Sequence, residues 1–185
     1  MKKRAILQKS KSFKGTDSLF VGGEFYADDE WISDQRTLST EGMYFLNGGR
    51  ACLTVIAGFL MAQGTQRILL PAYLCPTILD TLEACGLQYS FYRVNEDLSI
   101  DIEDLKQKAA EYQAIYFINY FGFPQPRTVQ QYLRTLQQQG KLLVEDNAQA
   151  GFMEQTLGDL TFNSMRKLCP QDGGYLRTRF DMQPF

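Results

Sequence analysis

The 185-residue chain contains no histidine. This absence excludes catalysis by a histidine acid or base, serine–histidine–aspartate triads and metal sites with histidine ligands. Any chemistry must therefore use lysine, carboxylate, tyrosine or cysteine side chains, or a bound cofactor. We expect no metal site.

Paired cysteines and long apolar runs are also missing. The four cysteines form no Cys-x-x-Cys pair, so we interpret them as buried apolar thiols and not as a disulfide framework: Cys52, Cys75, Cys85 and Cys169. No run approaches the ~20 apolar residues of a membrane span. Polar residues follow the basic start, Met1–Arg4, where a signal peptide has its apolar core. We therefore expect a cytoplasmic protein.

No charge of one sign dominates. The chain has 19 lysines and arginines against 21 aspartates and glutamates, a net charge of −2, which disfavours a broad nucleic-acid-binding surface. It is 44% hydrophobic, with 13 phenylalanines and 10 tyrosines, and this composition is typical of a folded chain with one large core.

The pattern along the chain predicts an arm followed by an α/β domain. Residues 1–40 are polar and irregular, and we interpret them as an N-terminal arm; a solvated tail is the alternative. Residues 41–185 alternate short apolar runs with helix-period segments, which predicts a three-layer domain with a mostly parallel, seven-stranded sheet and helices on both faces. Because no helix-length segment separates the last two strands, one of them can run antiparallel. The expected strands are Met43–Leu46, Ile68–Pro71, Gln88–Arg93, Ala114–Asn119, Lys141–Glu145, Leu160–Asn163 and Tyr175–Arg177.

Ligands of open α/β sheets bind beyond the carboxyl ends of the strands, and three such ends carry candidate groups. The first is Asn47–Arg50, between a strand and a helix, where glycines and a helix N-terminus favour an anion. It matches neither common phosphate-loop pattern, and a plain strand-to-helix turn is the alternative.

The other two ends carry ionisable side chains. Glu145 and Asp146 follow a buried strand, and since an unpaired buried charge is costly, we expect one to point to solvent and the other into the cleft; a helix or turn cap is the alternative. Lys167 follows the next strand and can serve as a Schiff-base nucleophile. A surface basic pair, Arg166 and Lys167, is the other interpretation.

Taken together, these segments resemble the large domain of DegT/DnrJ/StrS-type sugar aminotransferases, which depend on pyridoxal 5′-phosphate (PLP) and have fold type I. The resemblance covers about Phe45 to Thr178, and its most specific parts are the Glu-Asp-x-Ala-Gln-Ala stretch and the Ser-x-x-Lys stretch before Asp-Gly-Gly. Its landmarks are Asn47-Gly48-Gly49-Arg50-Ala51-Cys52-Leu53, Leu69-Leu70-Pro71-Ala72-Tyr73, Tyr120-Phe121-Gly122-Phe123-Pro124, Val144-Glu145-Asp146-Asn147-Ala148-Gln149-Ala150, Gly158-Asp159, Ser164-x-x-Lys167 and Asp172-Gly173-Gly174.

The resemblance implies roles for individual residues. Lys167 would bind the cofactor covalently and move the proton, and Asp146 would pair with the protonated ring nitrogen. The remaining contacts would hold the phosphate, the 3-hydroxyl and the ring face: Gly49, Arg50 and Ser164 at the phosphate, Gln149 at the hydroxyl, and Tyr73 or Cys75 on the ring.

The implied reaction is transfer of an amino group from an amino acid, commonly glutamate, to a keto-sugar that is usually nucleotide-linked. Relatives are homodimers that share the active site across the interface. They also carry a C-terminal small domain, which we expect to be missing here. Further departures are Cys75 in place of a common aromatic residue, Asn119 in place of a frequent histidine, and Asn147 in place of alanine.

Two alternatives stay open beside the aminotransferase. One is a catalytically silent protein that keeps the fold and cofactor binding. The other is a sugar dehydration catalysed by the same fold type. In those relatives the Schiff-base lysine is usually replaced by histidine, so Lys167 favours amino transfer.

Overall fold

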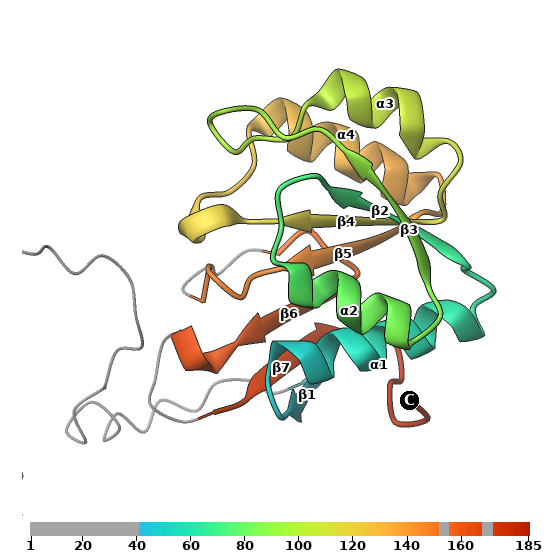
Figure 1. Ribbon diagram of the computed structural model, residues 1–185, viewed down its shortest axis with the longest axis vertical. Helices are drawn as coiled ribbons and strands as arrows, with labels where there is room; N and C mark the ends of the chain where they lie inside the picture. The colour runs from blue at the N-terminus through green and yellow to red at the C-terminus, as the bar shows by residue number, and fades with distance from the viewer. Residues whose placement is uncertain (1–40, 152–155, 168–171) are drawn as a thin grey trace, which may run out of the picture.

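The computed structural model describes residues 41–151, 156–167 and 172–185, and its centre is one seven-stranded sheet. The strands are β1 (Met43–Leu46), β2 (Arg67–Pro71), β3 (Gln88–Tyr92), β4 (Ala114–Ile118), β5 (Leu142–Asp146), β6 (Leu160–Ser164) and β7 (Gly174–Thr178). Their order is β1-β7-β6-β5-β4-β2-β3 (Figure 1). β7 is antiparallel to both neighbours, and the other strands share one direction. One of the last two strands is therefore antiparallel, as the sequence suggested.

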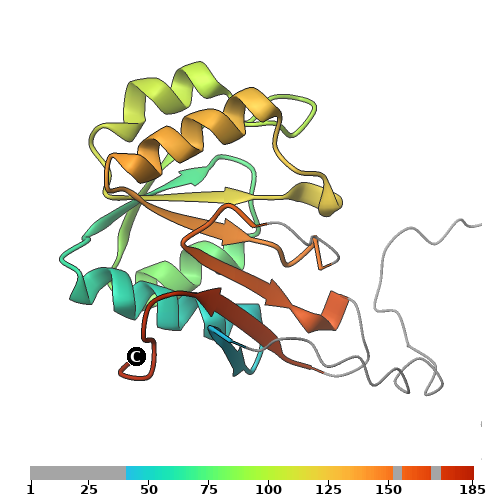
Figure 2. The same ribbon diagram turned by 180° about the vertical axis from the view of Figure 1, so that it is seen from behind.

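Helices cover both faces of the sheet. One face carries α1 (Gly49–Ala62) and α2 (Pro76–Ala84), and the other carries α3 (Ile102–Ala109) and α4 (Arg127–Gln138) (Figures 1 and 2). The predicted three-layer, mostly parallel architecture is confirmed. The predicted arm, residues 1–40, lies outside the described residues.

The central strands β2 and β4 are largely apolar because both of their faces are buried. In β2, Ile68 and Leu70 pack against α1 and α2, while Leu69 between them joins the core under α3 and α4. The same alternation in β4 sends Tyr116 to the first core and Phe117 to the second. A strand with a period of two residues therefore supplies two separate cores.

Local signals in the sequence set the helix ends. Pro76 occupies the first turn of α2, where its missing N–H costs nothing. Asp101 caps α3, since its Oδ1 accepts hydrogen bonds from the N–H groups of Glu103 (3.1 Å) and Asp104 (3.0 Å). Gly86 follows α2 with φ 78°, a left-handed conformation that glycine adopts without strain.

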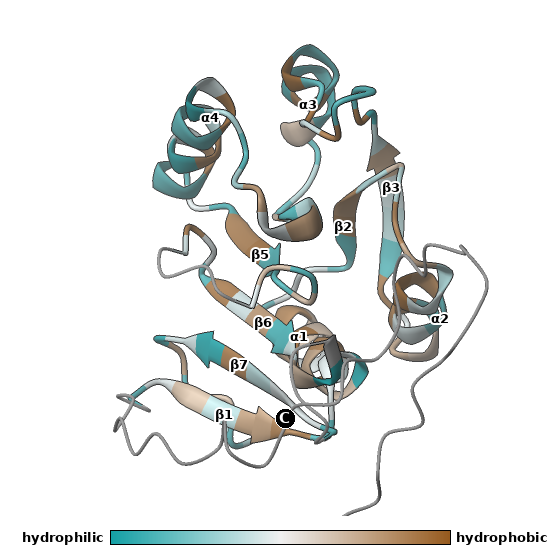
Figure 3. Cartoon of the chain, turned by 90° about the vertical axis from the view of Figure 1, so that its left-hand side faces the viewer, coloured by the Kyte–Doolittle hydropathy of each residue, from teal (hydrophilic) through white to brown (hydrophobic). Residues whose placement is uncertain are grey.

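The topology gathers loops at one edge of the sheet. β1, β2, β4, β5 and β6 all end at this edge, and β7, running the other way, begins there. The chain order reverses between β2 and β4, which is where open α/β sheets bind their ligands. Figure 3 views the sheet from this edge, with the two helical layers on either side.

Within the described residues, no helix combines the length and apolar character needed to cross a bilayer.

Candidate functional site

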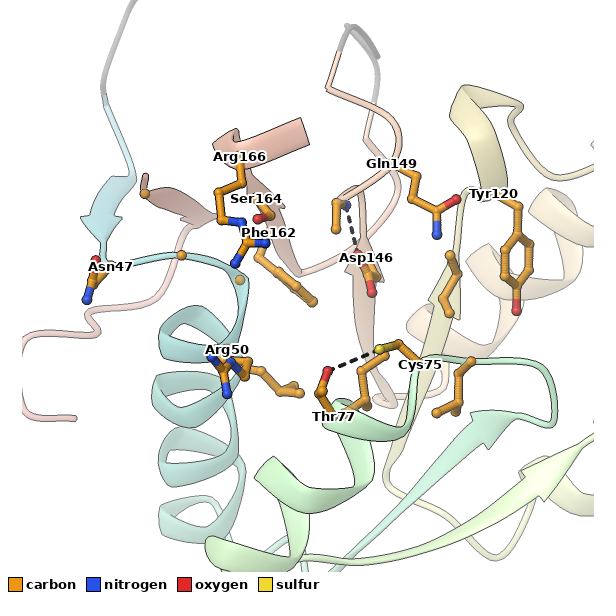
Figure 4. Close-up of a pocket in the computed structure, with 18 of the residues that line it drawn as sticks. Asn47, Arg50, Cys75, Thr77, Tyr120, Asp146, Gln149, Phe162, Ser164 and Arg166 are labelled. Atoms are coloured by element: carbon orange, nitrogen blue, oxygen red, sulfur yellow. Dashed lines mark hydrogen bonds between the residues drawn. The ribbon is translucent and has the colours of Figure 1, made fainter. Parts of the chain in front are cut away.

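A cleft of about 580 Å³ lies at this edge of the sheet (Figure 4). Segments far apart in the sequence line it, namely the loops after β1, β2, β4, β5 and β6 and the start of β7. Seven of the residues predicted for the cofactor line this one cleft: Gly49, Arg50, Tyr73, Cys75, Asp146, Gln149 and Ser164. The structure therefore brings together side chains that the sequence separates by more than 100 positions.

Gly48 and Gly49 at the start of α1 lie next to Ser164 at the end of β6, and we call these three residues the anion cradle because a helix N-terminus favours an anion. Gly48 precedes the helix with φ 104° and has no side chain to cap it, so the first N–H groups of α1 stay open to a ligand. A Cβ built on Gly49 would lie only 3.4 Å from the Cβ of Ser164 at the end of β6. Ser164 thus stands directly beside a helix N-terminus.

Close backbone contact fixes this cradle to the rest of the sheet. A Cβ built on Gly174, the first residue of β7, would lie 2.8 Å from the carbonyl carbon of Gly48 and 2.6 Å from the carbonyl oxygen of Asn163. Only glycine fits there. The Asp-Gly-Gly stretch of the sequence therefore has a packing role, which its resemblance to a motif did not reveal.

Asp146 lies at the end of β5, and its side chain reaches the cleft from the sheet (Figure 4). Oδ1 accepts a hydrogen bond from the N–H of Ala148 at 2.8 Å, and Oδ2 accepts one from the hydroxyl of Tyr116 at 2.5 Å. Burial raises the pKa of Asp146, while these two hydrogen bonds oppose that shift. Among the described residues, no lysine or arginine forms an ion pair with this carboxylate.

The position of Glu145, the neighbouring acid, differs from the one expected from the sequence. Glu145 does not point to solvent; it is 1% exposed and lies on the opposite face of the sheet from Asp146. Its Oε2 accepts the N–H groups of Leu157 and Gly158, both at 2.6 Å, and its Oε1 accepts from Asn119 at 2.7 Å. The strand alternation separates the two acids, and a network of neutral protein donors satisfies Glu145.

Two of the departures from the family pattern belong to this same network. Asn119 also donates to Oδ1 of Asn147 at 2.7 Å, and both side chains are buried. They lie on the same side of β4 and β5 as Glu145, and so away from the Asp146 carboxylate.

Cys75 contradicts the interpretation of the cysteines as buried thiols. It is exposed at the N-cap of α2, where its Sγ lies 3.2 Å from Oγ1 of Thr77. Cys52 fits that interpretation, because burial raises the pKa of its thiol to about 12. Cys85 is partly buried and free, and Cys169 lies outside the described residues.

Tyr73 lines the cleft beside a second tyrosine. Its ring centroid is 5.6 Å from that of Tyr120, and the hydroxyl of Tyr120 donates to the carbonyl of Tyr73. This bond ties the loop after β2 to the loop after β4, so the two loops nearest the reversal of chain order form one wall.

Lys167 is the last residue of a short 3-10 helix, η3 (Met165–Lys167), which follows β6 directly. Its side chain lies outside the described part of the structure, so its predicted role stays a prediction. The preceding residue, Arg166, lines the cleft.

Among the residues of the site that were not predicted from the sequence, three bear on its chemistry. Phe162 contributes an apolar wall, Arg166 adds a cation, and Tyr116 holds Asp146 from below. A signal existed for Tyr116, since it places a hydroxyl group in the otherwise apolar strand β4. The pattern could not reveal which carboxylate it meets, because the contact spans 30 positions.

The cleft fits pyridoxal 5′-phosphate in its donor set. A phosphate suits the open N–H groups and the hydroxyl of the anion cradle. A protonated pyridine nitrogen would give Asp146 the cationic partner that no described residue supplies. Between them, Phe162 offers an apolar surface.

No family model matches the sequence, and no curated protein matches it. Solved structures do match. The sugar aminotransferase CalS13 from Micromonospora echinospora has 23% identity and a TM-score of 0.60, covering 75% of this chain and 42% of that one. A DegT DnrJ EryC1 StrS aminotransferase from Brucella abortus has 18% identity and a TM-score of 0.59, with the same coverage. The chain has the aminotransferase fold.

That fold serves more than one reaction. A cysteine desulfurase from Thermococcus onnurineus NA1 matches with 19% identity and a TM-score of 0.63, covering 76% of this chain and 39% of that one. The chain spans about two fifths of the length of these solved proteins. The similarity confirms the fold that the motifs predicted, and the reaction has to be argued from the cleft.

Proposed function

We propose that the cleft binds pyridoxal 5′-phosphate and that the protein is an aminotransferase acting on a keto-sugar. One observation carries the proposal: a buried carboxylate, Asp146, and an anion cradle at the start of α1 line the same cleft. These are the two charged contacts that this cofactor needs. The fold of CalS13, a sugar aminotransferase, supports the same conclusion.

In this proposal each contact has one task. Gly49, Arg50 and Ser164 hold the phosphate, and Asp146 stays ionised opposite the ring nitrogen so that the nitrogen keeps its proton. Gln149 binds at the 3-hydroxyl.

The remaining proposed contacts are at the ring face, from the loop after β2, and at the reacting carbon, from a lysine. Tyr73 and Cys75 both line the cleft, and one of them would stack on the ring. Lys167 would hold the cofactor through its amine and would serve as the group that moves the proton. When bound, the cofactor supplies the sink for the electrons of the broken C–H bond.

The proposed substrates are an amino-acid donor, such as glutamate, and a keto-sugar acceptor, nucleotide-linked, of polysaccharide or secondary-metabolite biosynthesis. The proposal includes a cytoplasmic homodimer. The sugar acceptor is supported by the fold shared with the sugar aminotransferase CalS13, whereas the cytoplasmic homodimer rests on the sequence alone.

Mixing the purified protein with the cofactor tests the proposal. We expect the visible absorbance of lysine-bound cofactor in the wild type and its loss in Lys167→Ala. The matched control is Lys106→Ala, which removes an exposed amine from α3, away from the cleft, and should keep the absorbance. Equal spectra in both variants, or no absorbance in the wild type, would exclude the proposed site.

The same sample distinguishes the silent alternative. Adding glutamate to the loaded protein should convert the cofactor to its amine form and bleach the visible band. If the protein binds the cofactor but the visible band persists with every amino acid tested, the protein is the catalytically silent alternative.

A further inference from the structure

Tyr116 lies in the core beneath the cleft and contacts the carboxylate of Asp146. Its side chain is fully buried (0% exposed), and its hydroxyl donates to Oδ2 of Asp146 at 2.5 Å. The N–H of Ala148 takes the other oxygen at 2.8 Å. Each carboxylate oxygen therefore has one protein donor, and the two donors fix the plane in which the carboxylate lies.

The tyrosine is itself held in place. Its carbonyl oxygen accepts a hydrogen bond from the hydroxyl of Tyr92 at 2.8 Å, and its ring lies 6.2 Å from that of Phe162 on the next strand but one. The ring is packed in the first core, and among the described residues its hydroxyl has one hydrogen-bond partner, Oδ2 of Asp146. Tyr116 can therefore transmit the rigidity of the sheet to Asp146.

The surrounding groups leave Tyr116 as the donor. Burial, and then the charge of Asp146, hold the pKa of Tyr116 well above its usual value, so it keeps its proton. Within the described part of the chain, Cys52 of α1 and Tyr120 also interact with Asp146, and burial raises the pKa of both, so they stay neutral as well. The other charged groups among the described residues that line the cleft are Arg50, Arg166 and Asp172.

We propose that Tyr116 is the positioning residue of this site, holding Asp146 ionised and aimed into the cleft for the cationic group of the ligand. This inference rests on the proposed function for the identity of that ligand. The contact between Tyr116 and Asp146 can nevertheless be tested without any ligand.

The decisive experiment titrates Asp146 in the protein without cofactor. Infrared difference spectra report the protonated carboxyl band, and Asp146→Asn identifies which band belongs to this residue. Tyr116→Phe removes one hydrogen bond to a charged group, so we expect the midpoint to rise by about one pH unit or more. An unchanged midpoint would overturn the proposal.

Tyr92→Phe is the matched control, because it also removes a fully buried tyrosine hydroxyl, here from the core on the other face of the sheet. That hydroxyl donates to a backbone carbonyl and not to the carboxylate, so the titration midpoint of Asp146 should be unchanged. If Tyr92→Phe and Tyr116→Phe shift the midpoint equally, the effect is a loosened core and the positioning role is wrong.

If Tyr116→Phe does not fold, a second experiment replaces every tyrosine of the chain with a fluorinated tyrosine. A fluorinated phenol is the stronger donor, so the Asp146 midpoint should fall, and no change would overturn the proposal.

Cofactor binding then extends the test. Tyr116→Phe should bind pyridoxal 5′-phosphate about tenfold more weakly than Tyr92→Phe, the loss expected for one hydrogen bond to a charged group. If the wild type binds no cofactor at all, the proposed function fails while the titration still decides the role of Tyr116.

Discussion

At the scale of single residues, the two adjacent acids of β5 have opposite tasks. Glu145 sits among neutral donors and stabilises the core as a structural acceptor, while Asp146 has two donors and an open side toward the cleft. A period of two residues explains the separation. Asp146, whose carboxylate is open toward the cleft, is therefore the acid that is suited to contact a ligand.

Asp146 should therefore lower the stability of the protein without cofactor. Burial raises its pKa, so the folded state favours the protonated acid, and stability is lost as the pH rises through the unfolded-state and then the folded-state pKa. Asp146→Asn should unfold at higher urea than the wild type at neutral pH, and the difference should vanish at acidic pH below about 4.

Asp80→Asn, an exposed change on α2, is the control and should show no such pH-dependent gain. The prediction fails if Asp146→Asn is the less stable protein at neutral pH. The same variant should weaken the conversion of the cofactor by glutamate, so stability and function should change in opposite directions.

At the scale of elements, the approach of the loop before β6 to β5 depends on one small residue. The N–H of Gly158 donates to Glu145, and a Cβ added to Gly158 would lie 2.6 Å from the Cβ of Glu145 and 3.1 Å from its backbone nitrogen. The polar network of Glu145 can form only if the loop comes this close.

Gly158→Ala should thus destabilise the fold by about 1–3 kcal/mol, the usual cost of overpacking, as measured by urea unfolding. Gly58→Ala in α1 is the matched substitution. There the new methyl would meet only Phe185 at an ordinary 3.6 Å, and a glycine inside a helix is replaced, so stability should rise by roughly 1 kcal/mol. Equal effects of the two changes would contradict the packing argument.

At the scale of the whole molecule, the cleft joins loops from strands throughout the sheet. A ligand that contacts both the anion cradle and Asp146 links the start of α1 to the end of β5. Because only the folded chain has this site, such a ligand stabilises the folded state and not the unfolded one. Binding should therefore be visible as global stability.

Pyridoxal 5′-phosphate at about 100 times its dissociation constant should add ~2.7 kcal/mol and raise the thermal midpoint by roughly 5–10 °C. Scanning calorimetry measures the shift. Pyridoxal without the phosphate should give a smaller one, since it cannot use the anion cradle. Equal shifts from both compounds would argue against phosphate binding at α1.

Much of this architecture could be predicted because its signals are local. Apolar strands, Pro76, the cap at Asp101 and the glycine stops depend on neighbours within a few positions, and the expected element bounds lie close to the observed ones. The burial of Glu145 and the exposure of Cys75 could not be predicted, because each depends on partners from other elements.

The sequence by itself determined the fold and the set of groups at the carboxyl edge of the sheet, because strand direction and alternation follow from periodicity and from the rules of α/β connections. Only the tertiary structure decided which of these groups meet. The bond between Tyr116 and Asp146 and the contact of Gly174 with Gly48 join residues 30 and 126 positions apart. Such contacts are set by how the layers pack in three dimensions, and no local pattern encodes them.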